Sequence, residues 1–432
     1  MYYILLIIGL FSFTEKKSLN ESIKKDLPYL KNLYLNIHKN PEISLMEKET
    51  SEKLAVELEK IGFEVTRKFG GYGIVGVYKN GNGPTILYRT DMDALPMEEK
   101  TGLPYASKII TKNYDGSDVG TMHSCGHDMH MTVWTGTARA MIERKNEWEG
   151  TLIMLGQPAE EIGRGASMML NEGLFEKYPI PDYGIALHSS PIIPSGKVGF
   201  GKGYTMANTE SIDIKVRGQG AHGASPHMSI DPVVTASIII MELQTIVSRN
   251  INPIDDAVIT VGSIKGGTKH NIIPDEVNLQ LTIRTYKQEV RELIHKRIKE
   301  ICNGVASSMG LDKSRWPEII IPEGYTPANF NDSDLVDLMM SSSKEIIGND
   351  NVIVAEPQMV GEDFARFGNT KEKIPTVLYW LGTVPDERMK KYEDGNYALP
   401  ALHSPFYYPE IERSITTGIK VNTQSLIKIF SK

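Results

Sequence analysis

Hydrophobic positions along the chain follow two different periods, and their order predicts helices interleaved with strands. From 28 to 60 the apolar residues recur at helical spacing, and the apolar runs IGFEV, GIVGVYK and TILYRT then follow as strands between glycine-rich turns. A helix is predicted from His127 to Arg144, followed by the strand TLIMLGQP, a short helical stretch at 166–173 and the strand YGIALH. Helices between strands favour a mostly parallel sheet with functional loops at the strand ends.

A passage rich in proline and glycine, 191–203, separates this unit from a second pattern. Beyond it come the strand ESIDIKVRG, an apolar helix at 231–249, the strands DAVITVGSI and VNLQLTIRT, an amphipathic helix at 288–309 and the strand PEIIIPEG. The order βαββαβ is typical of a ferredoxin-like fold. A helix at 332–347, the strand TVLYWLG and a C-terminal helix from Ile411 then extend the first unit.

We therefore predict an α/β protein in which a smaller ferredoxin-like α+β unit interrupts a first unit whose mostly parallel sheet is flanked by helices. The predicted boundaries place a candidate signal segment at 1–20 and the ferredoxin-like unit at 204–323. The two parts of the first unit are expected at 21–203 and 324–432.

Composition and charge restrict the classes of function. The chain has 432 residues, of which 41% are hydrophobic and 23% charged, the balance of an ordinary globular enzyme. A net charge of −7 without a long basic run argues against nucleic acid as a partner. The two cysteines, Cys125 and Cys302, are too few for a disulfide framework.

The N-terminus is apolar from Met1 to Phe13, a stretch shorter than the roughly 20 residues of a transmembrane helix. It resembles the core of a signal peptide, although it lacks a basic n-region and an A-x-A cleavage site. We favour export slightly over a cytoplasmic location, with a retained anchor as the third alternative, and we expect no transmembrane span.

The densest cluster of reactive side chains lies in GTMHSCGHDMHM. Its members are His123, Cys125, His127, Asp128 and His130. The glycine between Cys125 and His127 allows both side chains to face one metal ion. A structural zinc finger would need a second Cys/His pair with finger spacing, which the sequence lacks, so a catalytic or binuclear site is favoured. The alternative is an inert group of helix caps and packed imidazoles.

Further candidate ligands follow predicted strands. Glu160 and Glu161 come directly after TLIMLGQP, where one glutamate can bind a cation while the other takes a proton from water. His188 ends YGIALH, and His403 lies in ALHSPFYYP. Alone, each of these is typical of a solvated loop or a packed histidine. Together with Cys125, they supply enough N, O and S ligands for two adjacent divalent ions.

Two acidic pairs have roles that the residues leave open. Asp91 and Asp93 follow the strand ILYRT and would either bind metal, orient a metal-binding histidine or fix a proline turn. Glu362 and Asp363, in GEDFARF, are candidates for the wall of the site.

The ferredoxin-like unit carries its own candidates. His222 and His227 lie in GQGAHGASPH, either as a helix-entry loop or, for His222, as a hydrogen-bond donor to a developing oxyanion. Asn271 lies in HNIIP, and Arg284 in TIRT offers the planar guanidinium that binds a carboxylate through two parallel hydrogen bonds.

The motifs DMDALP, HSCGHDMH, QPAEE, ALHSSP, GAHGASPH, NIIP, GEDF and LHSPF occur in this order over nearly the whole chain, from about residue 28 to the C-terminus. In these eight motifs the chain resembles the aminoacylase and hippurate hydrolase type of metal-dependent amidohydrolase. This group includes indole-acetyl-amino-acid hydrolases. That group is similar to the wider clan of binuclear-zinc aminoacylases and glutamate carboxypeptidases. The resemblance implies a catalytic domain interrupted by a ferredoxin-like lid, and two divalent metal ions per subunit: zinc or manganese, with cobalt as a further option.

The resemblance also implies a role for individual residues. The metal ligands that it implies are Cys125, His127, Glu161, His188 and His403. Glu160 is implied as the general base that takes a proton from a metal-activated water and then protonates the leaving amine. His222 is implied as the lid histidine that stabilises the oxyanion, in related enzymes often across a dimer. Asn271 and Arg284 are implied to hold the substrate carboxylate. For Asp91 and Asp93 we predict, independently of the resemblance, that they support the metal ligands instead of binding metal.

Two positions depart from the usual pattern of the family. Ser124 stands where alanine is commoner, and Arg164 stands where glycine is common. Neither is a proposed ligand, but Arg164 would change the charge of the cleft.

The leading hypothesis is therefore metal-dependent hydrolysis of the amide bond of N-acyl amino acids with acetyl, benzoyl or similar acyl groups. We also predict that the protein is a homodimer. A dipeptidase or small-peptide carboxypeptidase on the same scaffold is the enzymatic alternative. A catalytically silent metal-binding protein is the non-enzymatic alternative. A cysteine hydrolase using Cys125 with His127 or His130 is a third.

Overall fold

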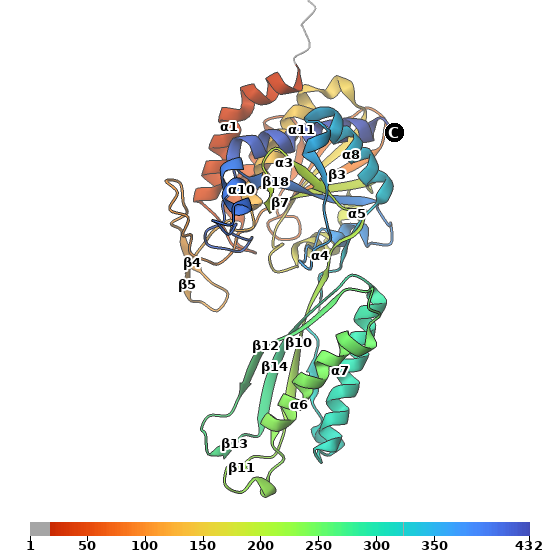
Figure 1. Ribbon diagram of the computed structural model, residues 1–432. Helices are drawn as coiled ribbons and strands as arrows, with labels where there is room; N and C mark the ends of the chain where they lie inside the picture. The colour runs from red at the N-terminus through yellow and green to blue at the C-terminus, as the bar shows by residue number, and fades with distance from the viewer. Residues whose placement is uncertain (1–17, 323) are drawn as a thin grey trace, which may run out of the picture.

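The computed structural model describes residues 18–322 and 324–432. It consists of a broad catalytic domain and an elongated lid that projects from it (Figure 1). The candidate signal segment falls almost entirely outside the described residues, and its cleavage stays a prediction, as do the domain boundaries drawn from the sequence.

The catalytic domain is built on one eight-stranded sheet with the order β1-β2-β6-β3-β7-β18-β8-β17. Its strands are β1 (Glu64–Thr66), β2 (Ile74–Asn80), β3 (Thr85–Asp91), β6 (Gly150–Gln157), β7 (Tyr183–Pro194), β8 (Val198–Phe200), β17 (Val352–Val354) and β18 (Thr376–Val384). The central strands β6, β3, β7 and β18 pair in parallel, whereas β2 and β8 pair antiparallel with β6 and β18. The predicted mostly parallel sheet is confirmed.

Helices cover both faces of this sheet. Tyr88 of β3 packs in a core with α1, α3, α8 and α11, whereas its neighbour Leu87 points to the opposite face, where α4, α5 and α9 contribute to the core. A further helix, α2, contributes to the same core as α1. The bounds of these helices are α1 (Leu19–Lys39), α2 (Lys48–Glu59), α3 (His127–Glu143), α4 (Gly165–Asn171), α5 (Leu174–Lys177), α8 (Ser333–Ile347), α9 (Ala365–Gly368) and α11 (Ile411–Phe430). A sheet buried on both faces leaves its strand ends as the place for function.

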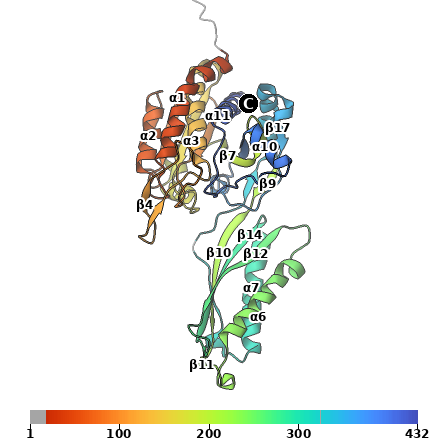
Figure 2. The ribbon, with the colours of Figure 1, turned by 60° about the vertical axis from the view of Figure 1, so that its left-hand side comes forward.

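The lid has the predicted order βαββαβ. Its elements are β10 (Asn208–Arg217), α6 (Pro232–Thr245), β12 (Ala257–Gly266), β14 (Glu276–Thr285), α7 (Gln288–Ser308) and β15 (Glu318–Ile320). The four strands form an antiparallel sheet with the order β12-β14-β10-β15, and both helices lie on one face of it (Figure 2). Alternate strand residues such as Ile212 and Leu279 pack against Ile239 and Ile294 of the helices. The ferredoxin-like lid is confirmed.

One helical segment of the lid, Pro232–Asn250, is long and apolar enough by length and composition to cross a membrane. It comprises α6 and a π-helical turn at Ile246–Asn250. A third of its most apolar window, 33%, is buried. Because Ile239 and Leu243 pack into the core of the lid, that packing accounts for part of the apolar character.

The helical region predicted from 28 to 60 starts earlier than predicted and is divided into two helices, whereas its end agrees with the prediction. One helix, α1, already begins at Leu19, because Ser18 and Glu21 form a capping box, and Pro28 lies inside the helix. The chain leaves α1 at Asn40, since the residue before Pro41 is disfavoured in helical conformation, and a second helix, α2, starts only at Lys48. The remaining elements are β4 (Ile110–Lys112), β5 (Asp118–Gly120), β9 (Gly203–Met206), β11 (Ala221–His222), β13 (Ile272–Ile273), β16 (Asn329–Asn331) and α10 (Asp386–Glu393).

Candidate metal centre and catalytic cleft

The candidate ligands meet where neighbouring parallel strands end. Asp91 is the last residue of β3, Glu160 and Glu161 follow β6, and His188 lies in β7. Because β6, β3 and β7 are adjacent and parallel, segments distant in sequence reach the same edge of the sheet.

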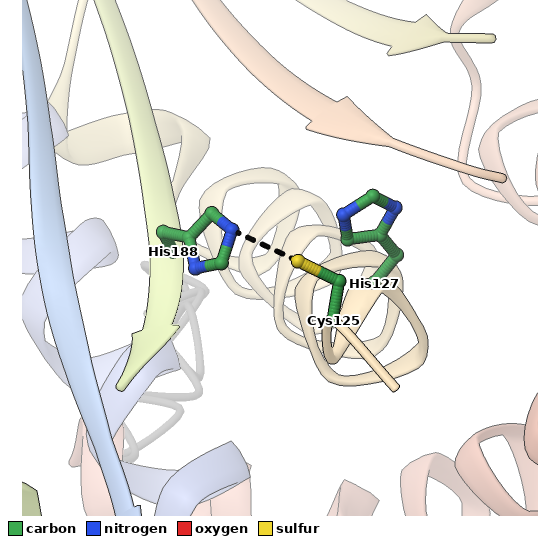
Figure 3. A group of neighbouring side chains, drawn as sticks. All are labelled: Cys125, His127 and His188. Atoms are coloured by element: carbon green, nitrogen blue, oxygen red, sulfur yellow. Dashed lines mark hydrogen bonds between the residues drawn. The ribbon is translucent and has the colours of Figure 1, made fainter. Parts of the chain in front are cut away.

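Gly126 directs the side chains on either side of it to one point. Its backbone is left-handed, with φ of 83°, and it precedes the first residue of α3, His127. A Cβ atom at this position would lie 2.9 Å from the side chain of Ser189 and 3.3 Å from the hydroxyl of Tyr407. Only glycine fits both the conformation and the space, and the turn brings Cys125 and His127 together (Figure 3).

All five predicted ligands come together in two groups that share Cys125. Its sulfur lies 3.5 Å from His188 Nε2, with His127 beside them (Figure 3). In the second group Cys125 lies with Glu161 and His403, whose Nε2 is 3.3 Å from Glu161 Oε2. Within each group the potential ligand atoms all lie within 4.8 Å of one another. Of the five residues, His403 alone is exposed.

Unpartnered atoms show that the cluster fits a cation. His127 Nδ1 donates to the carbonyl oxygen of Asp93 at 2.8 Å, which leaves Nε2 buried without a hydrogen-bond partner. Glu161 Oε1, 3.7 Å from that Nε2, is also buried and unpartnered. Burial alone would lower the pKa of His127, but Asp91, Glu161 and Asp93 raise it to about 10. This excess of negative charge is what a divalent cation neutralises.

Asp91 and Asp93 belong to neither of the two groups that share Cys125, although Asp91 forms a further candidate metal-binding group with His127 and His130. Asp91 accepts hydrogen bonds from His130 Nδ1 at 2.7 Å and from Arg89 at 2.8 Å. Burial opposes its ionisation, but His127, His130 and Arg89 hold the pKa of Asp91 well below its usual range. Asp93 accepts from the Ser44 hydroxyl and binds His127 through its carbonyl. Such support fixes the ring orientation of a ligating histidine.

His130 belongs to the cluster in sequence but has no free ring nitrogen. Its Nδ1 donates to Asp91, and its Nε2 accepts from the backbone N–H of Ser189 at 2.8 Å. The distinction from His127 depends on partners supplied by β3 and β7, which the HDMH spacing does not reveal. His130 is therefore a supporting residue in this structure.

Glu160 belongs to neither of the two groups that contain Cys125, but it lies in a further candidate group with His127 and Glu161. Its Oε2 is 3.9 Å from His127 Nε2. Burial and the nearby carboxylates of Glu362 and Glu161 raise the pKa of Glu160 well above its usual range. A carboxylate with increased proton affinity at the edge of a cation site is suited to accept and return a proton.

The loop before Glu160 is held in an unusual backbone conformation. Ala159 is left-handed, with φ of 53°, and its N–H donates to Glu47 at 2.7 Å. Strain of this kind persists only where surrounding contacts impose it, and it is common at functional sites. Glu47 is a supporting residue that the sequence analysis did not identify.

Sequence reasoning also missed Arg89, which is fully buried behind the site. Its guanidinium binds Glu362 at 2.8 Å, Asp91 at 2.8 Å and the side-chain oxygen of Gln157 at 3.0 Å. Asp363, the neighbour of Glu362, lies 3.4 Å away. The predicted wall residues are therefore a carboxylate pair compensated by one buried cation. The sequence did contain a signal for this role, because Arg89 is a charged residue within the apolar run TILYRT.

Two other histidines of the region lie outside the ligand groups. His123 is buried, with both ring nitrogens unpartnered, and burial lowers its pKa to about 4. His38, which the sequence analysis did not identify, binds Asp128 through Nδ1 at 2.6 Å and faces Glu99 through Nε2 at 3.3 Å. Asp128 is thus engaged by His38 instead of the candidate centre.

A cleft of about 1150 Å³ opens above the candidate centre. Cys125, Glu160 and His188 line it from the catalytic domain, and Thr209 and Arg284 line it from the root of the lid. A Cβ atom on Gly361, which precedes Glu362, would lie 2.3 Å from the hydroxyl of Thr209, so only glycine fits beside Thr209, to which Arg284 donates a hydrogen bond. Arg284 thus reaches the cleft in a single chain.

His222 and Asn271 lie elsewhere. His222 belongs to β11, which pairs with β13, and Asn271 directly precedes β13, where its carbonyl accepts a hydrogen bond from the N–H of Gly223. This sheet forms the end of the lid remote from the catalytic domain (Figure 1), and both residues are exposed. His227 lies close by in the turn before α6 and is also exposed. A single chain in this arrangement does not bring these residues to the cleft.

The environment of Cys125 argues against the cysteine hydrolase alternative. Burial and the carboxylates of Glu161 and Glu160 raise the pKa of the thiol well above its usual range. A nucleophilic cysteine needs the opposite, a pKa lowered by neighbouring positive charge. The position suits a thiolate that binds a cation.

Comparisons with known proteins agree with the motifs. The family described as peptidase family M20/M25/M40 matches residues 87–404. N-acetylcysteine deacetylase of Bacillus subtilis is 33% identical over 82% of this chain and 87% of its own length. Hippurate hydrolase of Campylobacter jejuni is 36% identical over 78% of this chain and 84% of its own length.

Among solved structures, a Bacillus subtilis protein described as a dinuclear metal-binding peptidase of the M20 family superposes with a TM-score of 0.75. It is 28% identical, and the match covers 94% of this chain and 99% of that one. These matches confirm the resemblance predicted from the eight ordered motifs. The chain belongs to peptidase family M20/M25/M40.

Proposed function

We propose that the protein hydrolyses the amide bond of N-acyl amino acids with two divalent metal ions. The observation that carries the proposal is the pair of ligand groups sharing Cys125, with Glu160 beside them. The activities named for the two relatives, N-acetylcysteine deacetylase and hippurate hydrolase, support the same class of substrate.

In this proposal the ligands are Cys125, His127, Glu161, His188 and His403. When bound, the metal ions supply the Lewis acidity that activates water and polarises the amide carbonyl. Glu160 takes one proton from the attacking water and transfers it to the amide nitrogen, so that the C–N bond breaks to give a carboxylic acid and an amine. Arg284 binds the α-carboxylate of the substrate with its guanidinium.

We further propose that the chain acts as a homodimer. One face of α6 exposes Val233, Val234, Ile238 and Met241, whose exposed fractions are 45%, 46%, 37% and 71%. The neighbouring β12 is an edge strand of the lid sheet. An apolar helix face beside an open sheet edge is suited to pair with a second copy of itself.

Dimerisation gives a role to the remote end of the lid. His222 Nδ1 accepts the N–H of Ala224 at 3.1 Å, which puts the ring proton of a neutral His222 on Nε2. In the proposed dimer this N–H reaches the cleft of the partner subunit and donates to the oxyanion that forms as the amide is attacked, with Asn271 beside it.

The test is hydrolysis of N-acetyl- and N-benzoyl-amino acids by the purified protein. Activity should be lost on chelation and restored by zinc, manganese or cobalt, and the metal that restores it best identifies the preferred ion. Dipeptides serve as competing substrates. Turnover of dipeptides without turnover of acyl amino acids would replace the proposal by a dipeptidase, and metal-bound protein inactive on both would contradict hydrolysis of either class.

A further inference from the structure

Three arginines line the cleft, and none of them forms an ion pair with a carboxylate among the residues that the structure describes. These are Arg164, Arg284 and Arg366. Arg284 donates to the hydroxyl of Thr209, and Arg366 donates to the backbone carbonyl of Tyr325. Arg164 is exposed. Three guanidinium groups therefore face one cleft with their charge uncompensated by the described part of the protein.

The described acidic residues of the cleft do not compensate these arginines. Glu161 lies in the ligand cluster, and Glu160 stands beside it. Glu362 is bound by the buried guanidinium of Arg89 at 2.8 Å. The negative charge of the cleft thus lies at its floor, where the cations bind, and its positive charge lies on its walls.

Arg164 and Arg366 belong to the same wall. The tight turn after Glu160, in which the N–H of Arg164 donates to the carbonyl of Ala159, places Arg164 at the start of α4. Arg366 lies in α9, which packs against α4. Ser167 and Asn171 of α4 line the same cleft. Arg284 enters from the lid and lies next to Gly361.

The Nε atom of Arg366 is buried without a hydrogen-bond partner. Arg366 as a whole is only half-buried and lines the cleft, so the accessible part of its guanidinium is what an anion would meet there. A carboxylate is the group whose geometry matches the planar donor edge of a guanidinium. The cleft also has more room, about 1150 Å³, than an acetylated small amino acid fills.

We propose that the preferred substrates carry a second carboxylate, in addition to the α-carboxylate, and that Arg164 and Arg366 bind it. This inference rests on the proposed function and specifies its substrate class. The second carboxylate belongs either to the amino-acid side chain, as in N-acetylglutamate, or to the acyl group, as in an N-succinyl amino acid. Both chemistries present the same anion to the same wall.

The experiment compares substrates that differ only in this charge. One pair is N-acetyl-L-glutamate and N-acetyl-L-glutamine, and the other is N-succinyl-L-alanine and its terminal amide, N-succinamoyl-L-alanine. For at least one pair we expect kcat/KM to be about tenfold or more higher for the charged substrate, the usual effect of a hydrogen bond to a charged group. The pair that shows the preference identifies the part of the substrate that carries the carboxylate.

The variants Arg164→Gln and Arg366→Gln should each reduce this preference, because each removes one guanidinium from the wall. Arg164 is exposed, so Arg164→Gln gives a test that does not depend on the folding of the Arg366 variant. Arg249→Gln is the matched control: Arg249 is an exposed arginine outside the cleft, and its substitution should leave the preference unchanged.

Equal kcat/KM within both pairs in the unsubstituted enzyme would overturn the inference while the turnover of the neutral substrates upholds the proposed function. A strong preference that survives in both variants would overturn the assignment to Arg164 and Arg366. Failure to hydrolyse any of the four substrates, with metal bound, would contradict the proposed function and this inference together.

Discussion

The candidate metal centre and the remote end of the lid carry predicted site residues in opposite physical settings. At the centre, His127 and His188 are buried, and each has one ring nitrogen fixed by a backbone carbonyl, which leaves the other facing the cluster. At the end of the lid, His222 lies on the two-residue strand β11, Asn271 directly precedes the two-residue strand β13, and both are exposed.

This difference shows that one chain completes the candidate metal centre but does not complete the predicted substrate-binding site. The five proposed ligands and Glu160 converge within a single catalytic domain. Of the three lid residues assigned to the substrate or the oxyanion, Arg284 alone reaches the cleft from its own chain. We infer that a single subunit can bind the metal ions. Full activity, in contrast, requires the end of the lid of a second subunit.

The largest effect is expected from removal of the shared ligand. Cys125→Ala takes away the one side chain that belongs to both ligand groups, so metal content and activity should both fall to background. Elemental analysis of the dialysed protein and hydrolysis of an N-acyl amino acid measure the two quantities.

Cys302→Ala is the matched control for this variant. Cys302 is buried in the core of the lid, between Ile298 and Val305 of α7, and has no contact with the candidate centre. Its substitution should leave the metal content unchanged. Full metal content in Cys125→Ala would remove Cys125 from the proposed ligands.

A smaller loss is expected from Glu160→Gln, because it removes the proton acceptor and leaves the ligands in place. The value of kcat should fall by about 10²- to 10⁴-fold, the usual contribution of a general base, while the metal content is retained. Glu161→Gln provides the comparison, since it should lower the metal content. If Glu160→Gln loses metal and Glu161→Gln keeps it, the two roles are exchanged.

Local signals made the centre and the fold predictable. Each proposed ligand lies in a short motif: Cys125 and His127 at the start of α3, Glu161 shortly after β6, His188 within β7 and His403 in a loop. A parallel sheet gathers the ends of its strands at one edge whatever the intervening sequence. The start of α1 could also have been predicted, because Ser18 and Glu21 have the spacing of a capping box. The helix was nevertheless predicted to begin later, at Pro28.

Contacts between distant segments were not predictable in the same way. Arg89 and Glu362 are 273 positions apart, and only the assembled sheet shows that one buried cation compensates the carboxylates of GEDF. The different tasks of His127 and His130 depend on Asp93, Asp91 and the N–H of Ser189. A single sequence gives residue types and spacing, whereas these roles depend on register and on hydrogen-bond partners.

The smallest of the three losses tests the lid. His222→Ala should keep its metal, because His222 lies remote from the ligands, and should lower kcat by about 100-fold, the effect of losing one oxyanion donor. His227→Ala, an exposed histidine of the neighbouring turn, is the matched control and should retain activity.

Mixed dimers decide whether His222 acts across the interface. A dimer that combines one His222→Ala chain with one Glu160→Gln chain, purified through a different tag on each, contains one cleft with both functional residues only if His222 reaches the partner's cleft. Half of the unsubstituted activity is then expected, although each variant alone is nearly inactive. If His222 acts in its own chain instead, one cleft of the mixed dimer lacks His222 and the other lacks Glu160, so the mixed dimer stays inactive. That result would mean that the lid closes within one subunit to complete the site.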